Sequence, residues 1–314
     1  MNAHGVVPAP KNGPDAAQSW TILSLVLWSA DYLASKGVES GRLDAEWLLA
    51  SALGTERLQL YLKYDRPVGP EEREVFKQQL RRRACREPLQ YILGRAAFRE
   101  LELVADPRAL IPRPETEVLV EEVLAWAKDR KWGLGTVMDI GTGTGAVSVS
   151  LAVEGVCEQI VATDISEGAL EVARLNAQRH GVEALLDFRR GSLFEIVDAG
   201  EAFDVIVSNP PYVATGERAG LQPEIRDWEP SEALFAGDDG LDVIQPLIAE
   251  APEHLTDGGL LALEVGLGQA ERVTRQIDDS GRFEPARVRR DLGGLPRVIM
   301  AERKTRATPQ ERAR

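Results

Sequence analysis

The sequence has 314 residues, of which 44% are hydrophobic and 28% charged, a composition typical of a folded globular protein and unlike that of a disordered chain. Its formal net charge of -13 argues against broad binding to phosphate backbones, which depends on Lys and Arg, and favours a neutral or basic partner surface. The two cysteines indicate neither a disulfide framework nor a thiolate metal site, and no apolar run reaches the roughly 20 residues that span a membrane. The N-terminus lacks the charged and apolar regions of a signal peptide, so the cytoplasm is the expected location.

The first part of the chain is predicted to be a small helical domain. Residues 1–17 are rich in Pro, Gly and Ala without periodicity, and we expect a flexible tail there. Over residues 18–87 the apolar residues recur at helical spacing, with glycines marking the breaks. The basic strip Arg81-Arg82-Arg83 is interpreted as a solvated helix face, although such a strip could also meet RNA.

Residues 88–114 are predicted to be a hairpin linker between two domains. Short apolar pieces at 101–103 and 110–111 stand on either side of Asp106-Pro107, a dipeptide that favours a turn. The chain beyond this linker has a different pattern.

Residues 115–303 are predicted to form an α/β domain with a Rossmann-like sheet. Short apolar strands alternate with helical patterns, which is typical of a doubly wound sheet whose parallel strands are buried on both faces. The expected strands are 136–140, 159–164, 186–189, 203–208 and 259–265, and the expected helices lie near 145–153, 167–180, 239–254 and 268–279. The last two apolar segments, 283–289 and 296–301, have no helix between them and predict a hairpin with one antiparallel strand at the sheet edge. Residues 304–314 are expected to be a second flexible tail.

A glycine-rich turn follows the first of these strands and opens a helix; its residues are Gly141, Thr142, Gly143, Thr144 and Gly145. Glycines there allow the backbone to turn tightly and to approach a ligand closely. Asp164 ends the next strand, where its carboxylate could accept hydrogen bonds from both hydroxyls of a ribose. This pattern indicates an adenosine-containing cofactor, but by itself it fits S-adenosylmethionine and a dinucleotide equally well.

The segment Asn209-Pro210-Pro211-Tyr212 follows the expected strand 203–208, so it should face the same crevice as the glycine turn. Proline has no N–H group, so this segment offers acceptors without competing donors. The Asn209 side-chain carbonyl and the Pro210 main-chain carbonyl could accept both hydrogens of a substrate NH2 group, and Tyr212 could pack against its planar framework. Together with the glycine turn, the segment predicts methyl transfer from S-adenosylmethionine to a planar NH2 nitrogen, promoted by positioning and electrostatic stabilisation. Asn209, Pro210 and Tyr212 are the expected catalytic residues, and Pro211 joins them in binding the substrate.

No metal is expected at this site. The three histidines, His4, His180 and His254, match no metal-ligand spacing and are interpreted as solvated surface residues.

From about residue 43 to residue 303 the chain resembles the HemK-type protein-glutamine N5-methyltransferases that modify peptide chain release factors. The resemblance rests on the glycine turn, on the Asn-Pro-Pro-Tyr segment, and on the stretches 44–49, 88–94 and 111–117. It implies an enzyme that methylates the glutamine of the Gly-Gly-Gln loop in class 1 release factors and so supports translation termination, with the helical domain docking the protein substrate. It assigns the cofactor contacts to residues 141–145, Asp164, Leu193 and Asn209, and implies no direct binding to nucleic acid or membrane.

Alternatives remain open at this point. Asn-Pro-Pro-Tyr also occurs in methyltransferases that act on adenine N6 in DNA or guanine N2 in RNA, so it defines the reaction better than the substrate. A glutamine methyltransferase for a ribosomal protein, a nucleic-acid methyltransferase and a noncatalytic binding module are the competing hypotheses.

Some positions depart from the family pattern or have two readings. Leu193 follows Ser192, where relatives often have Asp, and Arg99 follows an aromatic residue where relatives tend to have Gly. Arg113 either shapes the pocket or is an exposed linker residue. Glu264 either shapes the pocket or is an ordinary carboxylate at a strand end.

Overall fold

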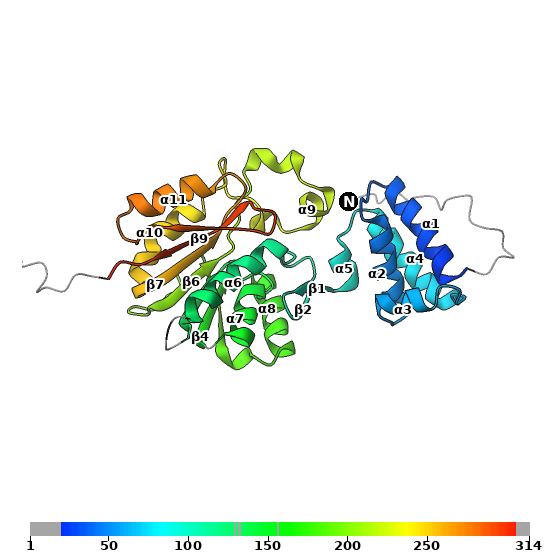
Figure 1. Ribbon diagram of the computed structural model, residues 1–314, viewed down its shortest axis with the longest axis horizontal. Helices are drawn as coiled ribbons and strands as arrows, with labels where there is room; N and C mark the ends of the chain where they lie inside the picture. Colours follow the sequence, from blue (N-terminus) through cyan, green and yellow to red (C-terminus); the bar gives the residue numbers. More distant parts are fainter. Residues whose placement is uncertain (1–19, 129, 131–132, 156, 306–314) are drawn as a thin grey trace, which may run out of the picture. The chain divides into compact units, whose positions relative to one another are not determined.

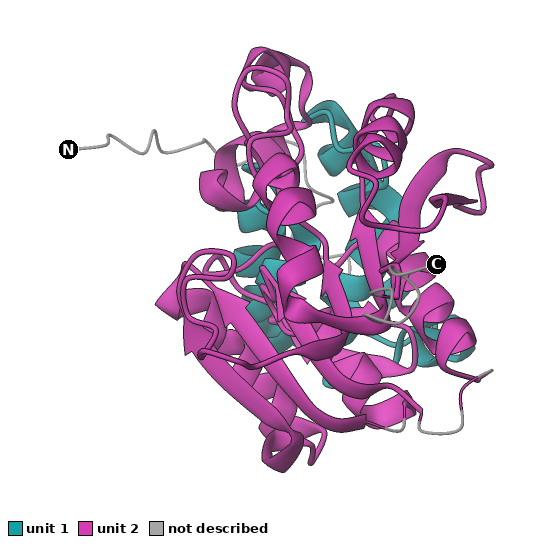
Figure 2. Ribbon diagram, turned by 90° about the vertical axis from the view of Figure 1, so that its left-hand side faces the viewer, with its two compact units in different colours: residues 1–93 teal, residues 94–314 magenta. Residues whose placement is uncertain are grey.

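The computed structural model describes residues 20–128, 130, 133–155 and 157–305, which are traced in Figure 1. The chain divides into two compact units between Leu93 and Gly94, coloured separately in Figure 2. The predicted tail at 1–17 lies outside the described residues, and so does the predicted C-terminal tail apart from residues 304 and 305. None of the described helices combines the length and the apolar character needed to cross a membrane.

The described part of the first unit consists of five helices and the turns that join them, which confirms the predicted small helical domain. α1 begins at a capping box, in which the Ser24 amide donates to the Thr21 hydroxyl (3.2 Å) and the Thr21 amide donates to the Ser24 hydroxyl (2.9 Å). α4 begins at Pro70, whose fixed φ suits the first helical position. The core is formed by the apolar faces of α1, α2 and α4 together with residues of α3 and α5. The helices are α1 (Ile22–Ser35), α2 (Gly41–Ala52), α3 (Arg57–Leu62), α4 (Pro70–Ala84) and α5 (Leu89–Leu93).

The interpretation of the arginine strip as a solvated helix face is wrong for Arg83. Phe76, Leu80 and Arg83 are spaced i, i+4 and i+7 along α4, and all three are buried on one face of that helix. The Arg83 guanidinium donates to the Asp44 carboxylate of α2, with Nε and Oδ2 2.6 Å apart, and to the backbone oxygen of Glu87 at 3.1 Å. Arg83 is therefore an internal ion-pair partner.

The second unit begins with an antiparallel hairpin, β1 (Arg95–Phe98) and β2 (Leu101–Val104). Its strands lie earlier than the sequence pattern indicates, because residues 110–111 belong to no strand. The chain reverses at Arg99, whose φ of 51° lies in the left-handed region that favours Gly. A second turn forms at Asp106, whose carboxylate accepts the Arg108 amide at 3.0 Å, and it separates 110–111 from the hairpin.

A seven-stranded sheet forms the centre of the second unit, with the strand order β5-β4-β3-β6-β7-β9-β8. The five strands from β5 to β7 are parallel, β9 runs antiparallel to β7, and β8 pairs with β9 at the edge. The predicted mostly parallel α/β sheet with an antiparallel hairpin at one edge is thus confirmed. The strands are β3 (Gly135–Ile140), β4 (Cys157–Asp164), β5 (Leu186–Arg190), β6 (Phe203–Ser208), β7 (Leu255–Glu264), β8 (Arg287–Arg290) and β9 (Pro296–Glu302).

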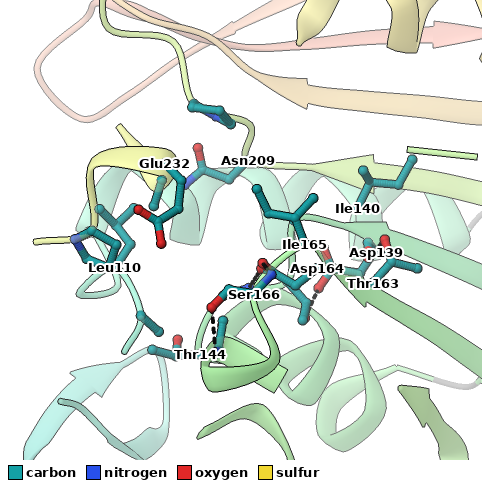
Figure 3. A pocket seen from close by; sticks show the side chains of 18 of the residues that line it. Leu110, Asp139, Ile140, Thr144, Thr163, Asp164, Ile165, Ser166, Asn209 and Glu232 are labelled. Carbon is teal, nitrogen blue, oxygen red and sulfur yellow. Dashed lines mark hydrogen bonds between the residues drawn. The ribbon is translucent and has the colours of Figure 1, made fainter. Parts of the chain in front are cut away.

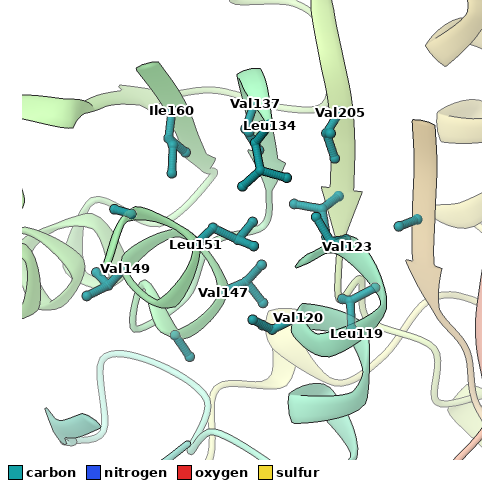
Figure 4. Packing of buried hydrophobic residues seen from close by; sticks show 14 of the residues in the cluster. Leu119, Val120, Val123, Leu134, Val137, Val147, Val149, Leu151, Ile160 and Val205 are labelled. Carbon is teal, nitrogen blue, oxygen red and sulfur yellow. The ribbon is translucent and has the colours of Figure 1, made fainter. Parts of the chain in front are cut away.

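Helices cover both faces of this sheet, so successive residues of a central strand enter different cores. In β3, Val137 packs into a cluster with α6 (Pro114–Lys128) and α7 (Ala146–Glu154), whereas Met138 packs with α10 (Ile244–His254) and α11 (Ala270–Asp279). Figure 4 shows the first cluster, in which side chains of α6 and α7 meet those of β3, β4 and β6. α8 (Glu167–Arg179) packs beside α7 and against β4 and β5. The remaining helical segments are short: 3-10 turns at Glu183–Leu185, Thr215–Gly220 and Ser231–Ala233, and α9 (Pro223–Trp228).

The strand order determines where a ligand can bind. The chain adds β4 and β5 on one side of β3 and then places β6 and β7 on the other side. In open α/β sheets the crevice outside the carboxyl ends of the strands, at such a reversal, is the usual ligand site. The glycine turn, Asp164 and Asn209 follow or end β3, β4 and β6, so all three lie at this edge.

Candidate active site

A cavity of about 440 Å³ lies outside the carboxyl ends of β3, β4 and β6 (Figure 3). Its volume is in the range of small-molecule sites. Eight of the residues predicted to bind cofactor or substrate line it: Gly141, Thr142, Gly143, Thr144, Asp164, Leu193, Asn209 and Pro211. The other three, Gly145, Pro210 and Tyr212, are outside its lining.

The glycine turn leaves room for a ligand beside its backbone. Gly141 and Gly143 have φ values of 74° and 56°, and a Cβ placed on either would meet no protein atom within 4 Å. The turn is attached to β4, since the amides of Gly141 and Thr142 both donate to the Thr163 carbonyl of that strand, at 2.9 and 2.8 Å. Gly145 has another role, because a Cβ there would lie 3.2 Å from the Cβ of Ala173 in α8. The first two glycines thus border open space and the third permits close helix packing.

Asp139, the last but one residue of β3, anchors this turn from inside the protein. Its carboxylate accepts the Thr142 hydroxyl at 2.7 Å and the Ser148 amide at 3.2 Å. Burial raises the pKa of Asp139 to about 6, although the hydrogen bonds from Thr142 and Ser148 lower it. The Thr142 side chain is therefore directed into the protein, and a ligand would meet the main chain of the turn.

Asp164 faces the cavity from the end of β4. Its two carboxylate oxygens accept the amides of Gly143 and Ser166, both at 2.9 Å. Burial raises the pKa of Asp164 above its ordinary value; these amides oppose the shift and the charge of Glu232 adds to it. Each oxygen keeps a further lone pair, so the carboxylate can still accept hydroxyl groups of a ligand such as a ribose. Figure 3 shows Glu232 and Leu110 on the opposite side of the cavity.

Asn209 follows β6 and is held by a side chain from α6. Its Nδ2 donates to the Thr116 hydroxyl at 3.0 Å, so the donor half of the amide is already engaged. The carbonyl oxygen on the other half remains an acceptor. Asn209 is half-buried and lines the cavity together with Thr116.

Tyr212 points toward β7. Its hydroxyl donates to the Glu264 carboxylate at 3.3 Å, and its main-chain oxygen accepts the Gln269 side chain at 2.9 Å. Burial and the neighbouring charge of Glu264 raise the pKa of the Tyr212 phenol. A Cβ on Gly266 would lie 3.0 Å from the Tyr212 ring, so this ring packs on protein backbone. Contact between Tyr212 and a substrate therefore remains a prediction.

An ion pair holds Arg113, which lines the cavity. The Arg113 guanidinium, in the segment before α6, lies 2.5 Å from the buried Glu229 carboxylate, which also accepts the Ile111 amide at 3.2 Å. Burial raises the pKa of Glu229, and Arg113 lowers it. Arg113 lines the cavity, so it helps to shape the pocket and is not simply an exposed linker residue.

Several residues considered from the sequence lie away from the cavity. His180 lies 3.1 Å from the Glu102 carbonyl and His254 stacks on Phe194, so both are half-buried and their interpretation as solvated residues is wrong. His4 lies outside the described residues. The Arg99 guanidinium pairs with Glu154 of α7 at 2.6 Å. In the part of the chain that the structure describes, no group of three or more His, Cys, Asp or Glu residues could hold a metal ion.

Sequence reasoning missed several residues that line or support the cavity: Arg108, Leu110, Thr116, Asp139, Glu229 and Glu232. Thr116 lies in a stretch that carries the family resemblance and Asp139 lies in the expected strand 136–140, so their positions were visible and their roles were not. Glu229 and Glu232 follow no motif. Glu229 reaches the site through contacts with Ile111 and Arg113, more than 100 positions away, and no local pattern signals such contacts.

Comparisons with known proteins match both units to known families. The family model described as "PrmC N-terminal domain" matches residues 24–94, and "Methyltransferase small domain" matches residues 115–222. A "Release factor glutamine methyltransferase" of Geobacter sulfurreducens is 45% identical over 280 residues, which cover 89% of this chain and 96% of the relative. A protein of the same description from Rhodopirellula baltica is 35% identical over 286 residues, covering 90% and 97%.

Solved structures support the fold alone. The structure described as the hMettl16 catalytic domain in complex with MAT2A 3'UTR hairpin 6 matches with a TM-score of 0.54 and 16% sequence identity, covering 73% of this chain and 84% of that chain.

Proposed function

The chain belongs to the release factor glutamine methyltransferases, and from this membership we propose that it methylates the side-chain amide nitrogen, N5, of the glutamine in the Gly-Gly-Gln loop of class 1 peptide chain release factors. It is a methyltransferase, and S-adenosylmethionine is the methyl donor that its family implies. A release factor substrate also implies the cytoplasm, where translation takes place. The negative net charge of the whole chain favours a protein substrate over a nucleic acid.

The observation that carries the proposal is the shared cavity. An acceptor-rich segment at the end of β6 and a glycine turn with an adjacent carboxylate at the ends of β3 and β4 border one space of about 440 Å³. The first is suited to hold an NH2 group, and the second is suited to hold an adenosine. Methyl transfer requires the two in one place.

We assign the cofactor contacts to the glycine turn, Asp164 and Leu193. The open space beside Gly141 and Gly143 fits a ligand that approaches the main chain closely. Asp164 would accept the ribose hydroxyls, and Leu193, which lines the same cavity, would contribute an apolar contact to the base. When bound there, S-adenosylmethionine supplies a methyl group activated by its positively charged sulfur.

We assign the substrate contacts to the segment from Asn209 to Tyr212. The Asn209 carbonyl and the Pro210 main-chain carbonyl would accept the two N–H groups of the glutamine amide, which fixes the direction of the nitrogen lone pair. Both acceptors would also stabilise the partial positive charge that the nitrogen gains as its bond to the methyl carbon replaces the sulfur–methyl bond, before one N–H proton passes to solvent. Pro211 would border the amide, and Tyr212 would support this segment through Glu264. Positioning and hydrogen bonding supply what this transfer needs, so the proposal includes no metal.

The test is methylation of a purified class 1 release factor with isotope-labelled S-adenosylmethionine, followed by mass spectrometry of the Gly-Gly-Gln peptide. We expect one methyl group on the glutamine side chain. A release factor with that glutamine replaced by glutamate should bind and stay unmethylated, because a carboxylate has no N–H to donate. Comparable transfer to the glutamate variant, or label appearing only in RNA or a ribosomal protein, would contradict the proposal.

A further inference from the structure

Four side chains from three parts of the second unit, Asn209 among them, are linked by hydrogen bonds. Thr116 lies in the first turn of α6, Glu264 is the last residue of β7, and Asn209 and Tyr212 lie in the segment after β6. The Asn209 Nδ2 donates to the Thr116 Oγ1 at 3.0 Å, and the Thr116 hydroxyl donates to the Glu264 Oε2 at 2.6 Å. The Tyr212 hydroxyl donates to the other oxygen of Glu264 at 3.3 Å. Glu264 has no exposed surface and Thr116 is 3% exposed.

The chemistry of these groups imposes one direction on the chain of hydrogen bonds. An ionised carboxylate can only accept, so the single proton of the Thr116 hydroxyl must point toward Glu264. The Thr116 oxygen then has only lone pairs to offer to Asn209. An asparagine side chain can satisfy that oxygen only with its NH2 group, and its carbonyl is thereby turned to the other side.

From this arrangement we infer that Thr116 and Glu264 are positioning residues that fix the orientation of the Asn209 amide, so that its carbonyl is presented to the substrate nitrogen. The inference rests on the proposed role of Asn209 as an acceptor for the glutamine amide. A reversed amide would place an NH2 group opposite the NH2 group of the substrate. Two donors would then face each other and neither could be satisfied.

The arrangement also explains why the orientation must be imposed. The two ends of an asparagine side chain have nearly the same size and shape, so packing alone cannot distinguish them. The distinction has to come from a neighbour that is restricted to accepting. Thr116 could donate or accept, and Glu264 removes that freedom.

The test compares variants at Thr116 that separate its hydroxyl from its bulk. Thr116→Val keeps the shape and removes the hydroxyl, whereas Thr116→Ser keeps the hydroxyl and removes a methyl group. We expect Thr116→Val to lower kcat for release factor methylation by about tenfold or more, on the scale of a lost fixed donor or acceptor in an active site. Thr116→Ser should stay within about threefold of wild type, and KM for S-adenosylmethionine should change little in both.

A second pair tests the inference if Thr116→Val folds poorly, as judged by its thermal midpoint. Thr116→Ala and Thr116→Ser differ by a single oxygen atom, so Ala should have the lower kcat at equal SAM affinity. If Val or Ala is as active as Ser, or if Ser is the variant that loses activity, then Thr116 acts through packing and the inference is overturned. The wild-type enzyme distinguishes the two proposals: if it fails to methylate the glutamine, the proposed function is wrong, whereas an active wild type with insensitive Thr116 variants refutes only the positioning role.

Discussion

The protonation state of the buried Glu264 carboxyl affects the geometry of the site. Burial raises the pKa of Glu264 to about 7, and Glu115 in α6 adds to this shift through its charge. The hydrogen bonds from Thr116 and Tyr212 and the charge of Arg297 in β9 act in the opposite direction. The carboxyl therefore titrates near neutral pH.

We predict that kcat rises with pH through about 7 as Glu264 becomes ionised and able only to accept. A neutral Glu264 could donate to Thr116, which would permit the reversed amide of Asn209. The pH profile of kcat in wild type and in Glu264→Gln checks this, since the amide variant should lose the step near pH 7. An identical step in both would assign the titration to another group.

The same shift has the opposite sign for stability. An unfolded glutamate has its ordinary pKa near 4.3, so between about pH 4.3 and 7 the folded protein binds more protons at this site than the unfolded chain. The contribution of Glu264 to the free energy of unfolding should therefore fall as pH rises through that window, by roughly 4 kcal/mol at most. Urea unfolding of wild type and Glu264→Gln at both ends of the window measures it. Activity and stability thus respond to this carboxyl in opposite directions.

Asp164 and Asn209 should differ in which kinetic constant they control. Asp164 would contact a part of the cofactor that does not change during transfer, so Asp164→Ala should raise KM for S-adenosylmethionine with a smaller effect on kcat. Asn209 would contact the reacting nitrogen, so Asn209→Ala should mainly lower kcat, by about 10²-fold or more. Initial rates with both substrates varied provide the comparison. A kcat within about threefold of wild type for Asn209→Ala would remove this residue from the role assigned to it.

The glycine turn and the proline segment were found from the sequence because local backbone chemistry reveals them. Positive φ in the glycine turn and the missing N–H groups of Pro210 and Pro211 follow from residue type alone. Thr116 and Glu264 had no such mark, because their roles depend on partners 93 and 148 positions apart. Such contacts arise only after the sheet and α6 are assembled.

At the scale of elements, the stability of the first unit is sensitive to the loss of either partner of the buried ion pair between α2 and α4. The side chains of Asp44 and Arg83 are 5% and 7% exposed, and Ser40 adds a hydrogen bond to Asp44 at 2.8 Å. Arg83→Ala would leave the Asp44 carboxylate buried without its cation. We predict that this substitution destabilises the first unit by about 3–5 kcal/mol.

Urea unfolding followed by circular dichroism measures this loss, with Arg81→Ala as the matched control. Arg81 is exposed on the same helix, so its removal should change stability by about 0.5 kcal/mol or less. Combining Arg83→Met with Asp44→Leu should recover much of the loss, because an apolar pair needs no charge compensation. Equal effects of Arg81→Ala and Arg83→Ala would contradict the importance of the buried pair.

The elements themselves were largely predictable where periodicity was strong. All five parallel strands and the terminal hairpin were expected near their observed positions, since apolar runs bounded by turns are typical of buried strands. α6 was missed because its segment starts at the Pro-rich end of the predicted linker, although Pro114 is favourable at a helix start. The hairpin was displaced because its turn uses Arg99 in a left-handed conformation, and an arginine does not by itself indicate such a turn as a glycine would.

At the scale of the whole molecule, the division into two compact units suggests that the second unit can be tested as a separate fragment. All residues that line the cavity belong to the second unit. A fragment of residues 94–314 should therefore, if it is soluble, retain binding of S-adenosylmethionine. We predict that it methylates intact release factor far more slowly than the full chain, because the family resemblance implies that the helical domain docks the protein substrate.

Isothermal calorimetry with S-adenosylmethionine and methylation rates on both intact release factor and a short Gly-Gly-Gln peptide test this prediction. The ratio of the two rates should shift toward the peptide in the fragment, since a peptide has little to dock. Undiminished activity on the intact factor would show that the first unit does not contribute to recognition.

The acceptor pair proposed at Asn209 and Pro210 also sets an upper limit on the number of methyl groups added. A primary amide offers two N–H groups to two carbonyls, whereas the monomethylated product offers only one. One carbonyl would then lose its partner and the added methyl group would crowd it, so the product should bind more weakly than the starting glutamine. The same feature that selects the substrate thus favours release of the product after one turnover and disfavours a second transfer to the same nitrogen.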